Sequence, residues 1–195
     1  MRGHYFHQDL HVAQRIAAAN PQKHVDIGSR TDGFVAHVAS FRPIEILDIR
    51  PIDTQVKNIH FTQANLMELP QHMLQYCDSI SSLHAIEHFG LGRYNDPIDY
   101  WGYQKALHNI AEIIKPGGVF YFGTPIGPQR IEFNAHRVFA IQHLLDVLSP
   151  YFTLQHFSFI DDAGNFHPYI HLTPELIANN CHCHYGCGVF ELIRK

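Results

Sequence analysis

Apolar residues in this chain fall into short continuous runs, separated by segments in which apolar positions recur every three or four residues. The first pattern predicts buried strands, and the second predicts helices with one apolar face. The predicted strands are 24–27, 45–48, 59–62, 79–83, 119–123, 152–160 and 189–193. The predicted helices are 8–19, 101–115 and 136–148. Strands that alternate with helices in this way indicate an α/β fold built around a mostly parallel sheet.

The segments between these elements indicate a single domain. A Pro-Gly-Gly sequence at 116–118 ends the helix 101–115, which has the clearest apolar face. The segment 161–188 is too long for a turn between the last two strands, so we predict that it is a functional excursion. The sequence contains no linker and no internal repeat, so residues 1–195 are predicted to form one domain.

Composition narrows the class of partner. The chain has 195 residues, of which 46% are hydrophobic and only 16% are charged, with a net charge of −4 and 17 histidines. No apolar run is long enough to cross a bilayer, and the first residues lack the apolar stretch of a signal peptide, so we expect a cytoplasmic location. Because Lys and Arg form no cluster, we expect no nucleic-acid or membrane partner. A small-molecule acceptor fits better.

A glycine turn follows the first predicted strand. In the sequence GSRTDG at 28–33, Arg30 stands where a dinucleotide-binding turn needs its middle glycine, so NAD and FAD are disfavoured. The turn also lacks the Lys-Ser/Thr pair of a phosphate-binding P-loop. Asp48 ends the second strand about 20 residues after Gly28, where a carboxylate accepts hydrogen bonds from a ribose. The residues therefore favour an adenosyl ligand without phosphates.

Several short motifs follow one another along the predicted strands: Asp26-Ile27-Gly28, Asp48, Asn65 in QANLMELP, SLHAIEHFG and IIKPGGVFYFGTP. They occur in the order and spacing of class I S-adenosylmethionine-dependent methyltransferases, and the chain resembles that superfamily. This resemblance implies a Rossmann-like α/β fold with a seven-stranded, mostly parallel sheet, an antiparallel last strand and helices on both faces. It also implies an enzyme that uses S-adenosylmethionine as its cofactor.

A closer likeness rests on three further stretches, IEHFGLGRYNDPID, FNAHRVF and the YGCG before the last strand. In these the chain is similar to a small family of uncharacterised methyltransferase-like proteins of bacteria and nematodes. Bacterial members tend to lie among genes for surface polysaccharides. The likeness therefore implies a sugar or glycan-precursor acceptor.

The superfamily resemblance also implies a set of cofactor contacts. Gly28 corresponds to the glycine under the methionine moiety, Asp48 to the ribose-binding acid and Asn65 to the polar residue near the adenine amino group. Asp26 corresponds to the acid that orients the loop or the methionine end. The neighbouring positions Ser29, Arg30, Ile49, Leu66, Leu83 and His84 complete the expected cofactor site.

Candidate catalytic residues follow the fourth predicted strand, at the edge of the sheet where ligands bind. These residues are His84, Glu87 and His88. If a helix starts here, His84 and His88 lie one turn apart on one face, with Glu87 close by. A histidine is a suitable general base for removing a proton from an acceptor hydroxyl. The alternative is that these side chains only pack and bond to the backbone.

Two further segments carry polar side chains suited to an acceptor. Arg93, Tyr94 and Asp96 lie in a turn-rich loop, which is otherwise a solvated surface loop. His136 and Arg137 open the predicted helix 136–148, where Asn134 is expected to be a helix cap. We therefore predict that Arg93, Tyr94, Asp96, His136 and Arg137 bind substrate.

The Cys/His-rich segment 181–187 raises the question of a metal-dependent enzyme. Cys181, Cys183 and Cys187 lack the repeated spacing of a structural zinc site, so we predict no metal and expect Cys187 to be a buried apolar residue. Two alternatives to a methyltransferase remain. The chain is either a divergent S-adenosylmethionine-binding domain without catalysis, suggested by Arg30 and Asp32, or a metal-dependent enzyme that uses segment 181–187.

Overall fold

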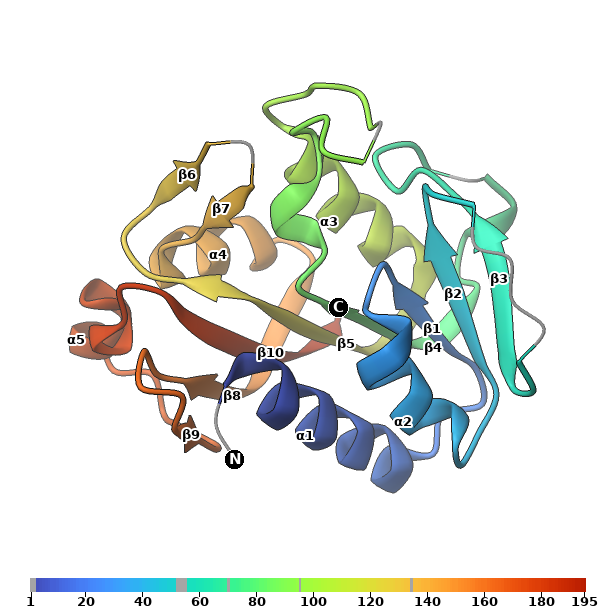
Figure 1. The fold of residues 1–195 in the computed structure, drawn as a ribbon, viewed down its shortest axis with the longest axis horizontal. Helices are drawn as coiled ribbons and strands as arrows, with labels where there is room; N and C mark the ends of the chain where they lie inside the picture. The colour runs from blue at the N-terminus through green and yellow to red at the C-terminus, as the bar shows by residue number, and fades with distance from the viewer. Residues whose placement is uncertain (1–2, 52–55, 70, 95, 134) are drawn as a thin grey trace.

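A twisted sheet forms the centre of the computed structural model, which describes residues 3–51, 56–69, 71–94, 96–133 and 135–195 (Figure 1). Its strand order is β3-β2-β1-β4-β5-β10-β8-β9. The strands β1 to β5 pair in parallel, and β10 lies antiparallel between β5 and β8. The bounds are β1 His24–Ile27, β2 Ile44–Asp48, β3 Ile59–Gln63, β4 Cys77–Leu83, β5 Ile114–Ile126, β8 Phe152–Ile160, β9 Phe166–His167 and β10 Gly186–Arg194.

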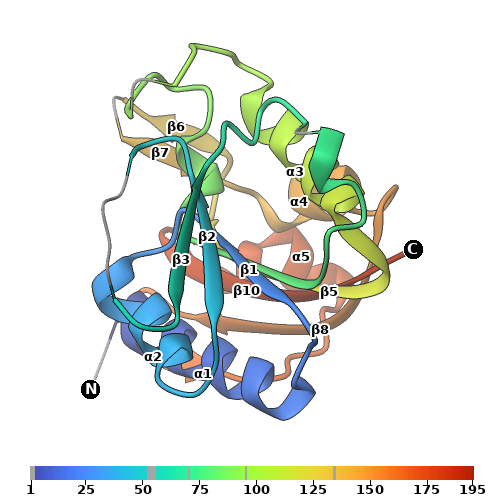
Figure 2. The same cartoon turned by 90° about the vertical axis from the view of Figure 1, so that its right-hand side faces the viewer.

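Helices cover both faces of this sheet, as Figure 2 shows. One face carries α1 (His4–Ala19) and α2 (Ala36–Ala39), and the other carries α3 (Gly102–Ile113) and α4 (Ile141–Leu148). Single turns of helix occur at Thr31–Val35, Gln71–Met73, Ile86–His88 and Asn180–His182. The remaining elements are α5 (Pro174–Ala178) and a separate hairpin of β6 (Arg130–Glu132) and β7 (His136–Val138).

Two apolar layers hold the helices to the sheet. On the α3 side, Phe120, Phe122 and Phe190 stack with ring centroids 5.4 and 5.9 Å apart, and all three are fully buried. On the α1 side, Val12 and Ile16 pack over the opposite face of the sheet. Each fully buried side chain of this size stabilises the fold by about 1.5–3 kcal/mol. The strand ends that carry polar residues are thus held on a rigid frame.

The predicted α/β fold with an antiparallel last strand is confirmed. The sheet has one more strand than predicted, because Phe166–His167 in the predicted excursion pairs with the end of β8. The strand β5 also begins earlier than predicted, because the Pro-Gly-Gly turn continues directly into it from the end of α3. That turn is possible because Gly117 adopts a φ of 78°, in the left-handed region that favours glycine.

The prediction of one helix over 136–148 is wrong in its first part. Residues His136–Val138 form β7, and the helix α4 begins only at Ile141. The reason is a tertiary contact, since Arg137 is buried and donates to the carbonyl oxygens of Glu87, Phe89 and Tyr100. Within the described residues, no helix is both long enough and apolar enough to cross a membrane.

Candidate functional site

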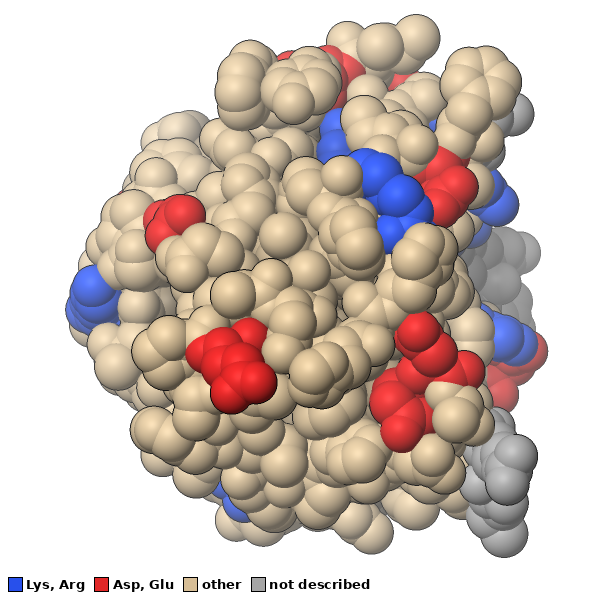
Figure 3. Space-filling view, turned by 90° about the vertical axis from the view of Figure 1, so that its left-hand side faces the viewer, with Lys and Arg blue, Asp and Glu red and all other residues tan. Residues whose placement is uncertain are grey.

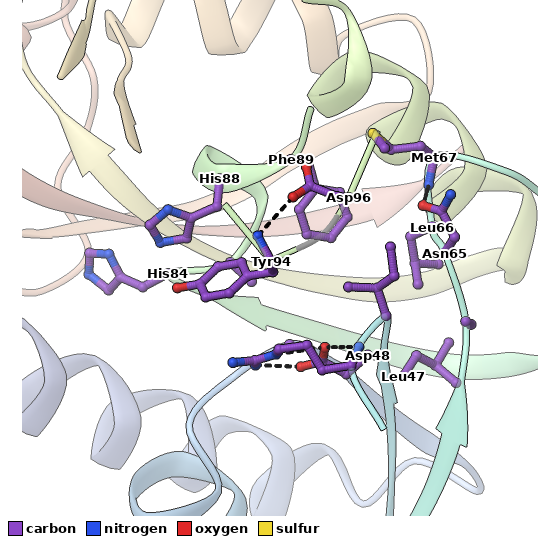
Figure 4. Close-up of a pocket in the computed structure, with 15 residues that line it drawn as sticks. Leu47, Asp48, Asn65, Leu66, Met67, His84, His88, Phe89, Tyr94 and Asp96 are labelled. Carbon is purple, nitrogen blue, oxygen red and sulfur yellow. Dashed lines mark hydrogen bonds and ion pairs between the residues drawn. The ribbon is translucent and has the colours of Figure 1, made fainter. Parts of the chain in front are cut away.

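A pocket lies at the carboxyl ends of β1, β2 and β4, where open α/β sheets bind their ligands. It is a small, partly open hollow, with about 60 Å³ available to the centres of water molecules. Figure 4 shows its walls. We call it the nucleotide pocket. Its lining residues are Gly28, Leu47, Asp48, Ile49, Arg50, Ala64, Asn65, Leu66, Met67, His84, Ala85, His88, Phe89, Tyr94 and Asp96.

Gly28 forms the tight turn that opens the pocket. Its φ is 66°, and a Cβ at this position would lie 3.0 Å from the Cβ of Ala85. Its backbone N–H donates to the carbonyl oxygen of Leu47 at 3.1 Å, which ties the turn to β2. Only glycine satisfies both the conformation and the close approach without strain. The turn therefore leaves backbone, and no side chain, at this wall of the pocket.

Asp26 and Ser29 hold that turn from below. The Asp26 carboxylate accepts hydrogen bonds from the Ser29 N–H at 2.9 Å, the Ser29 hydroxyl at 2.7 Å and the Ser81 hydroxyl at 2.6 Å. The Ser29 hydroxyl in turn accepts a bond from the Leu83 N–H at 3.0 Å. All are buried, and none lines the pocket. Of the predicted cofactor residues, Asp26, Ser29 and Leu83 thus position the site rather than forming its surface.

The same buried network reaches back to His24. Its ring nitrogens lie 2.8 Å from the Ser79 hydroxyl and 3.1 Å from the Ser81 hydroxyl. Burial lowers the pKa of His24 to about 3. Burial raises the pKa of Asp26 to about 6, although its hydrogen bonds act in the opposite direction. A neutral imidazole and a weakly acidic carboxyl group therefore share one serine beneath the glycine turn.

Arg30 lies outside the nucleotide pocket, although it was predicted to bind the cofactor. Its guanidinium forms a two-bond ion pair with Asp32, with distances of 3.1 and 2.9 Å. It also lies 5.0 Å from the centre of the Tyr5 ring. The side chain is directed to the surface, and this explains how a bulky residue is tolerated where related turns have glycine.

Asp48 lies at the pocket wall with its carboxylate already bonded. Its oxygens accept from the Arg50 backbone N–H at 2.8 Å and from the Arg50 guanidinium at 3.0 and 2.6 Å. The guanidinium also lies 4.6 Å from the centre of the Tyr94 ring, so that Tyr94 lies across the pocket between Asp48 and His88 (Figure 4). Arg50 was not singled out from the sequence, where nothing distinguishes it from a surface arginine.

The far end of the pocket is mostly apolar. Ile49, Leu66 and Met67 give it hydrophobic walls, and Asn65 supplies a polar group. The Asn65 side-chain oxygen accepts from the Met67 N–H at 3.1 Å, and its amide nitrogen lies 3.4 Å from a Glu68 oxygen. This combination suits a planar heterocycle that carries a few hydrogen-bonding groups. The predicted cofactor residues Ile49, Asn65 and Leu66 are therefore brought together with Gly28 and Asp48.

The three predicted catalytic residues adopt a tighter turn than expected. Instead of an α-helix, His84 adopts a left-handed φ of 55° and Ile86–His88 form a single 3₁₀ turn. The Nδ1–H of His84 donates to Glu87 at 2.9 Å, with the two side chains only 6% and 2% exposed. Burial alone would lower the pKa of His84, but Cys187 and Glu87 outweigh it and raise the pKa well above its usual value.

His88 has the geometry expected of a general base. Its Nδ1–H donates to the Ala135 carbonyl oxygen at 2.6 Å, which fixes the tautomer and leaves the Nε2 lone pair available. The ring lines the pocket and meets the Tyr94 ring edge-on, with centroids 5.5 Å apart. His88 thus bonds to the backbone through one ring nitrogen and keeps the other available as a base.

The predicted acceptor loop divides into three roles. Tyr94 lines the pocket, whereas Arg93 is exposed and lies 5.7 Å from the Tyr94 ring centre. The Asp96 carboxylate accepts from the backbone N–H groups of Gly90, Gly92 and Tyr94 at 2.7, 3.3 and 3.1 Å. Asp96 therefore folds the loop around itself, and its oxygens are occupied by that task.

His136 and Arg137 also have different roles, although both were predicted to bind substrate. The three bonds from Arg137 to carbonyl oxygens tie β7 to the turn after β4, so its guanidinium is structural and does not reach the pocket. His136 is half-buried between His88 and Tyr185, with ring centroids 6.1 and 5.4 Å away. Burial lowers the pKa of His136. Asn134 lies outside the described residues.

Cys187 does not join Cys181 and Cys183. Those two cysteines pack in the apolar layer on the α3 side, and Cys187 packs on the α1 side, beside His84 and His4. We call His4, His84, Glu87, His136 and Cys187 the histidine cluster. His4 comes from the start of α1, so no local sequence signal links it to the other members.

A family model matches residues 36–166 of the chain, and that family is described as "Caenorhabditis protein of unknown function, DUF268". The match confirms the predicted resemblance to a nematode family. No curated protein sequence is significantly similar to the chain.

Solved structures share the fold. The (4+2)-cyclase SpnF is 13% identical, with a TM-score of 0.66 over 95% of this chain and 80% of that one. The N-methyltransferase NodS from Bradyrhizobium japonicum WM9, in complex with S-adenosyl-L-homocysteine, is 12% identical, with a TM-score of 0.60 over 94% and 84%.

A third structure is the 1,6-didemethyltoxoflavin-N1-methyltransferase of Burkholderia thailandensis, with bound 1,6-didemethyltoxoflavin and S-adenosylhomocysteine. It is 14% identical, with a TM-score of 0.60 over 96% and 78%. At such identities the similarity establishes the methyltransferase fold and leaves the ligand to be argued from the site.

Proposed function

The chain belongs to the DUF268 family described from Caenorhabditis, and from the site it carries we propose that it is an S-adenosylmethionine-dependent methyltransferase. The observation that carries this proposal is the meeting of Gly28 and Asp48 at one pocket. A turn free of side chains and a carboxylate at the end of the next strand are what an adenosine linked to an amino-acid chain requires.

The pocket residues fit this cofactor in three places. Ile49 and Leu66 would hold the adenine between apolar surfaces, with Asn65 at its polar edge. The Asp48 carboxylate would accept bonds from the ribose hydroxyls. The backbone of the Gly28 turn would lie under the methionine end, where a Cβ would obstruct it.

One contact must change for the ribose to bind. The Asp48 oxygens are bonded to Arg50, whose guanidinium is half-exposed and rests on Tyr94. Because the side chain of Arg50 is long and reaches solvent, it can swing away without breaking the core. We infer that binding exchanges the Arg50–Asp48 pair for bonds from Asp48 to the ribose.

Bound S-adenosylmethionine supplies a methyl group on a positively charged sulfur, and the chain's own residues have to align the acceptor and remove its proton. His88 fits the second task, because its Nε2 lone pair is set by the bond from Nδ1–H to Ala135. Tyr94 fits the first, since its ring crosses the pocket beside His88. His84 and Glu87 form a buried pair at the same end of the pocket.

The acceptor that we propose is a hydroxyl of a sugar or glycan precursor. On the face in Figure 3, the Lys and Arg side chains are few and those at the upper right adjoin Asp and Glu side chains, so this face has no broad basic surface, which favours a compact acceptor over a polyanion. The groups at the His88 end of the pocket are tyrosine hydroxyl and imidazole, which suit hydroxyl recognition.

Calorimetric titration with S-adenosylhomocysteine tests the cofactor, with NAD as the control. We expect micromolar binding of S-adenosylhomocysteine, worth about −8 kcal/mol, and none of NAD. Equal binding of both ligands, or of NAD alone, would contradict the proposal.

A screen of sugar acceptors with methyl-labelled S-adenosylmethionine tests the reaction. His88→Ala should lower kcat by about 100-fold or more while leaving S-adenosylhomocysteine affinity unchanged. The exposed His72 serves as a matched control, because His72→Ala should change neither quantity. A His88→Ala enzyme with full kcat would remove His88 from the mechanism.

A second candidate is a domain that binds S-adenosylmethionine without transferring its methyl group. The observation that favours it is the fold shared with SpnF, which is a cyclase. The two candidates separate in a single assay, because tight S-adenosylhomocysteine binding without methyl transfer to any acceptor supports the second.

A further inference from the structure

Three potential metal ligands come together beside the nucleotide pocket. One ring nitrogen each from His4 and His84, and the sulfur of Cys187, lie within 4.8 Å of one another. They come from α1, the end of β4 and the start of β10, so three separate parts of the fold converge on one point. The rings of His4 and His84 are parallel within 3°, with centroids 5.6 Å apart.

One of these ligands has a buried atom without a partner. Within the described residues, Nε2 of His84 forms no hydrogen bond, although the side chain is only 6% exposed. A buried nitrogen left unpaired costs about 1–3 kcal/mol, so such an atom in a native site indicates an unseen partner. The sulfur of Cys187 bonds instead to Gln8 Oε1 at 3.3 Å.

The other nitrogen of His84 has the partner that metal-binding histidines have. Its Nδ1–H donates to Glu87 at 2.9 Å, and Glu87 is itself 2% exposed. A carboxylate in this position fixes the ring orientation and the tautomer, and leaves Nε2 directed at the metal. Packing alone does not account for this chain of contacts, in which a buried carboxylate orients an imidazole whose other nitrogen is unpaired.

We propose that His4, His84 and Cys187 bind a transition metal ion of the zinc class, with Glu87 orienting His84. One thiolate and two imidazoles suit Zn²⁺, Co²⁺ or Ni²⁺ and are poor ligands for Mg²⁺ and Ca²⁺. Metal–ligand bonds of about 2.0–2.3 Å place tetrahedral donors roughly 3.3–3.8 Å apart, so the cluster needs only a small closure.

Three protein ligands leave a fourth position open, which is the arrangement of catalytic rather than structural zinc sites. His84 also lines the nucleotide pocket, so one of the three metal ligands is part of the pocket wall. The metal site does not depend on the proposed cofactor, since none of its three ligands comes from the glycine turn or from β2.

Metal content and cobalt spectroscopy of the untagged full-length protein test this site. We expect about one zinc per chain after dialysis, and a cobalt-substituted form with the intense visible bands of a tetrahedral site and a near-ultraviolet sulfur-to-cobalt band. Cys187→Ser should abolish the sulfur band, and His4→Ala and His84→Ala should each lower metal affinity by 100-fold or more. Glu87→Gln should lower it by about 10–100-fold.

Matched controls come from neighbouring residues of the same types. Cys183→Ser should keep the sulfur band, because Cys183 packs in the other apolar layer, and His7→Ala on α1 should keep full affinity, because His7 stacks on Phe166. If Cys187→Ser fails to fold, the sulfur band of the Cys183→Ser protein and the His4→Ala affinity decide the question.

Two results would overturn the proposal. One is a protein that binds neither zinc nor cobalt, and the other is a metal lost on Cys183→Ser and retained on Cys187→Ser. S-adenosylhomocysteine titration of the same samples separates the two proposals. A protein that holds metal but not S-adenosylhomocysteine refutes the proposed function alone, and the reverse result refutes the metal site alone.

Discussion

The nucleotide pocket and the histidine cluster adjoin each other at the same edge of the sheet, and they differ in how their polar groups are satisfied. In and beneath the pocket, the carboxylates of Asp26, Asp48 and Asp96 each accept several hydrogen bonds from the protein. Around the cluster, unpaired buried atoms gather. Within the described residues these include Nε2 of Gln8, His84 and His136, and Oε2 of Glu87.

The difference indicates that the pocket side is a preformed scaffold, whereas the histidine cluster lacks a binding partner for its unpaired atoms. The pocket side is complete in itself, so its shape exists before any ligand arrives. The cluster side holds unpaired groups at a cost of about 1–3 kcal/mol each, which a fold tolerates where those groups have a function. We therefore expect mutations of the glycine turn and its supporting network to change ligand affinity and stability, and mutations in the cluster to change metal binding.

We expect the largest effect from Gly28→Val, which places a side chain at the wall of the nucleotide pocket. The new side chain would start 3.0 Å from the Cβ of Ala85, so S-adenosylhomocysteine affinity should fall by more than 100-fold, or about 2.7 kcal/mol. Calorimetric titration measures this loss. Gly117→Val is the matched control, because Gly117 has the same left-handed conformation but no atom within 4 Å of a Cβ. Wild-type affinity in Gly28→Val would place the ligand elsewhere.

How much of this pocket the sequence predicts depends on the range of the interactions. Gly28, Asp48, Asn65 and Leu66 lie at or just after the ends of strands, and strand order alone brings strand ends together. The roles of Asp26 and Ser29 beneath the pocket depend on Ser81, which lies 55 residues from Asp26 in sequence. Hydrophobic periodicity carries no information on such contacts.

The histidine cluster shows the same limit more sharply. His84 and Glu87 are close in sequence and were singled out together, but His4 and Cys187 join them only because α1 crosses the sheet near the start of β10. The cysteine-rich segment gave no sign of this arrangement, because Cys181 and Cys183 lie in the turn before β10 and pack on the other side of the sheet from Cys187. Arg137 was likewise unpredictable as a buried residue.

The second prediction tests whether the network beneath the pocket is as complete as its hydrogen bonds indicate. Burial lowers the pKa of His24 to about 3, whereas the unfolded chain takes up this proton near 6.5. The unfolded state therefore binds more protons between these values, and the stability due to neutral His24 is lost as the pH falls through this window. At pH 5 the loss is about 2 kcal/mol.

Chemical denaturation at pH 7 and at pH 5 measures this loss. His24→Asn should unfold more easily at pH 7 but lose about 2 kcal/mol less than the wild type on acidification, and the exposed His60 provides the control variant, His60→Asn. Asp26 acts in the opposite direction, because burial raises its pKa to about 6 and its ionisation above pH 4 costs stability. An unchanged pH dependence in His24→Asn would mean that His24 has the same pKa in the folded and the unfolded chain.

A third prediction concerns the one contact on the pocket side that has to change. Asp48→Asn should weaken S-adenosylhomocysteine binding by about tenfold, because a charge-assisted bond to the ribose is lost. Arg50→Ala should strengthen binding by a smaller factor, since no guanidinium then competes for the carboxylate. Titration of both variants and of the double variant measures the coupling. A loss of affinity in Arg50→Ala would mean that Arg50 contacts the ligand.

The smallest effect should come from Arg30→Ala, where the sequence expectation and the geometry disagree most. The turn places Arg30 among the predicted cofactor contacts, but its guanidinium is bonded to Asp32 and packs on Tyr5 at the surface. Exposed ion pairs of this kind contribute little to stability. We therefore expect less than a twofold change in S-adenosylhomocysteine affinity and only a small shift in the unfolding midpoint. A tenfold loss of affinity would mean that the ligand extends past the glycine turn toward α1, and that the binding site includes Arg30 as well as the nucleotide pocket.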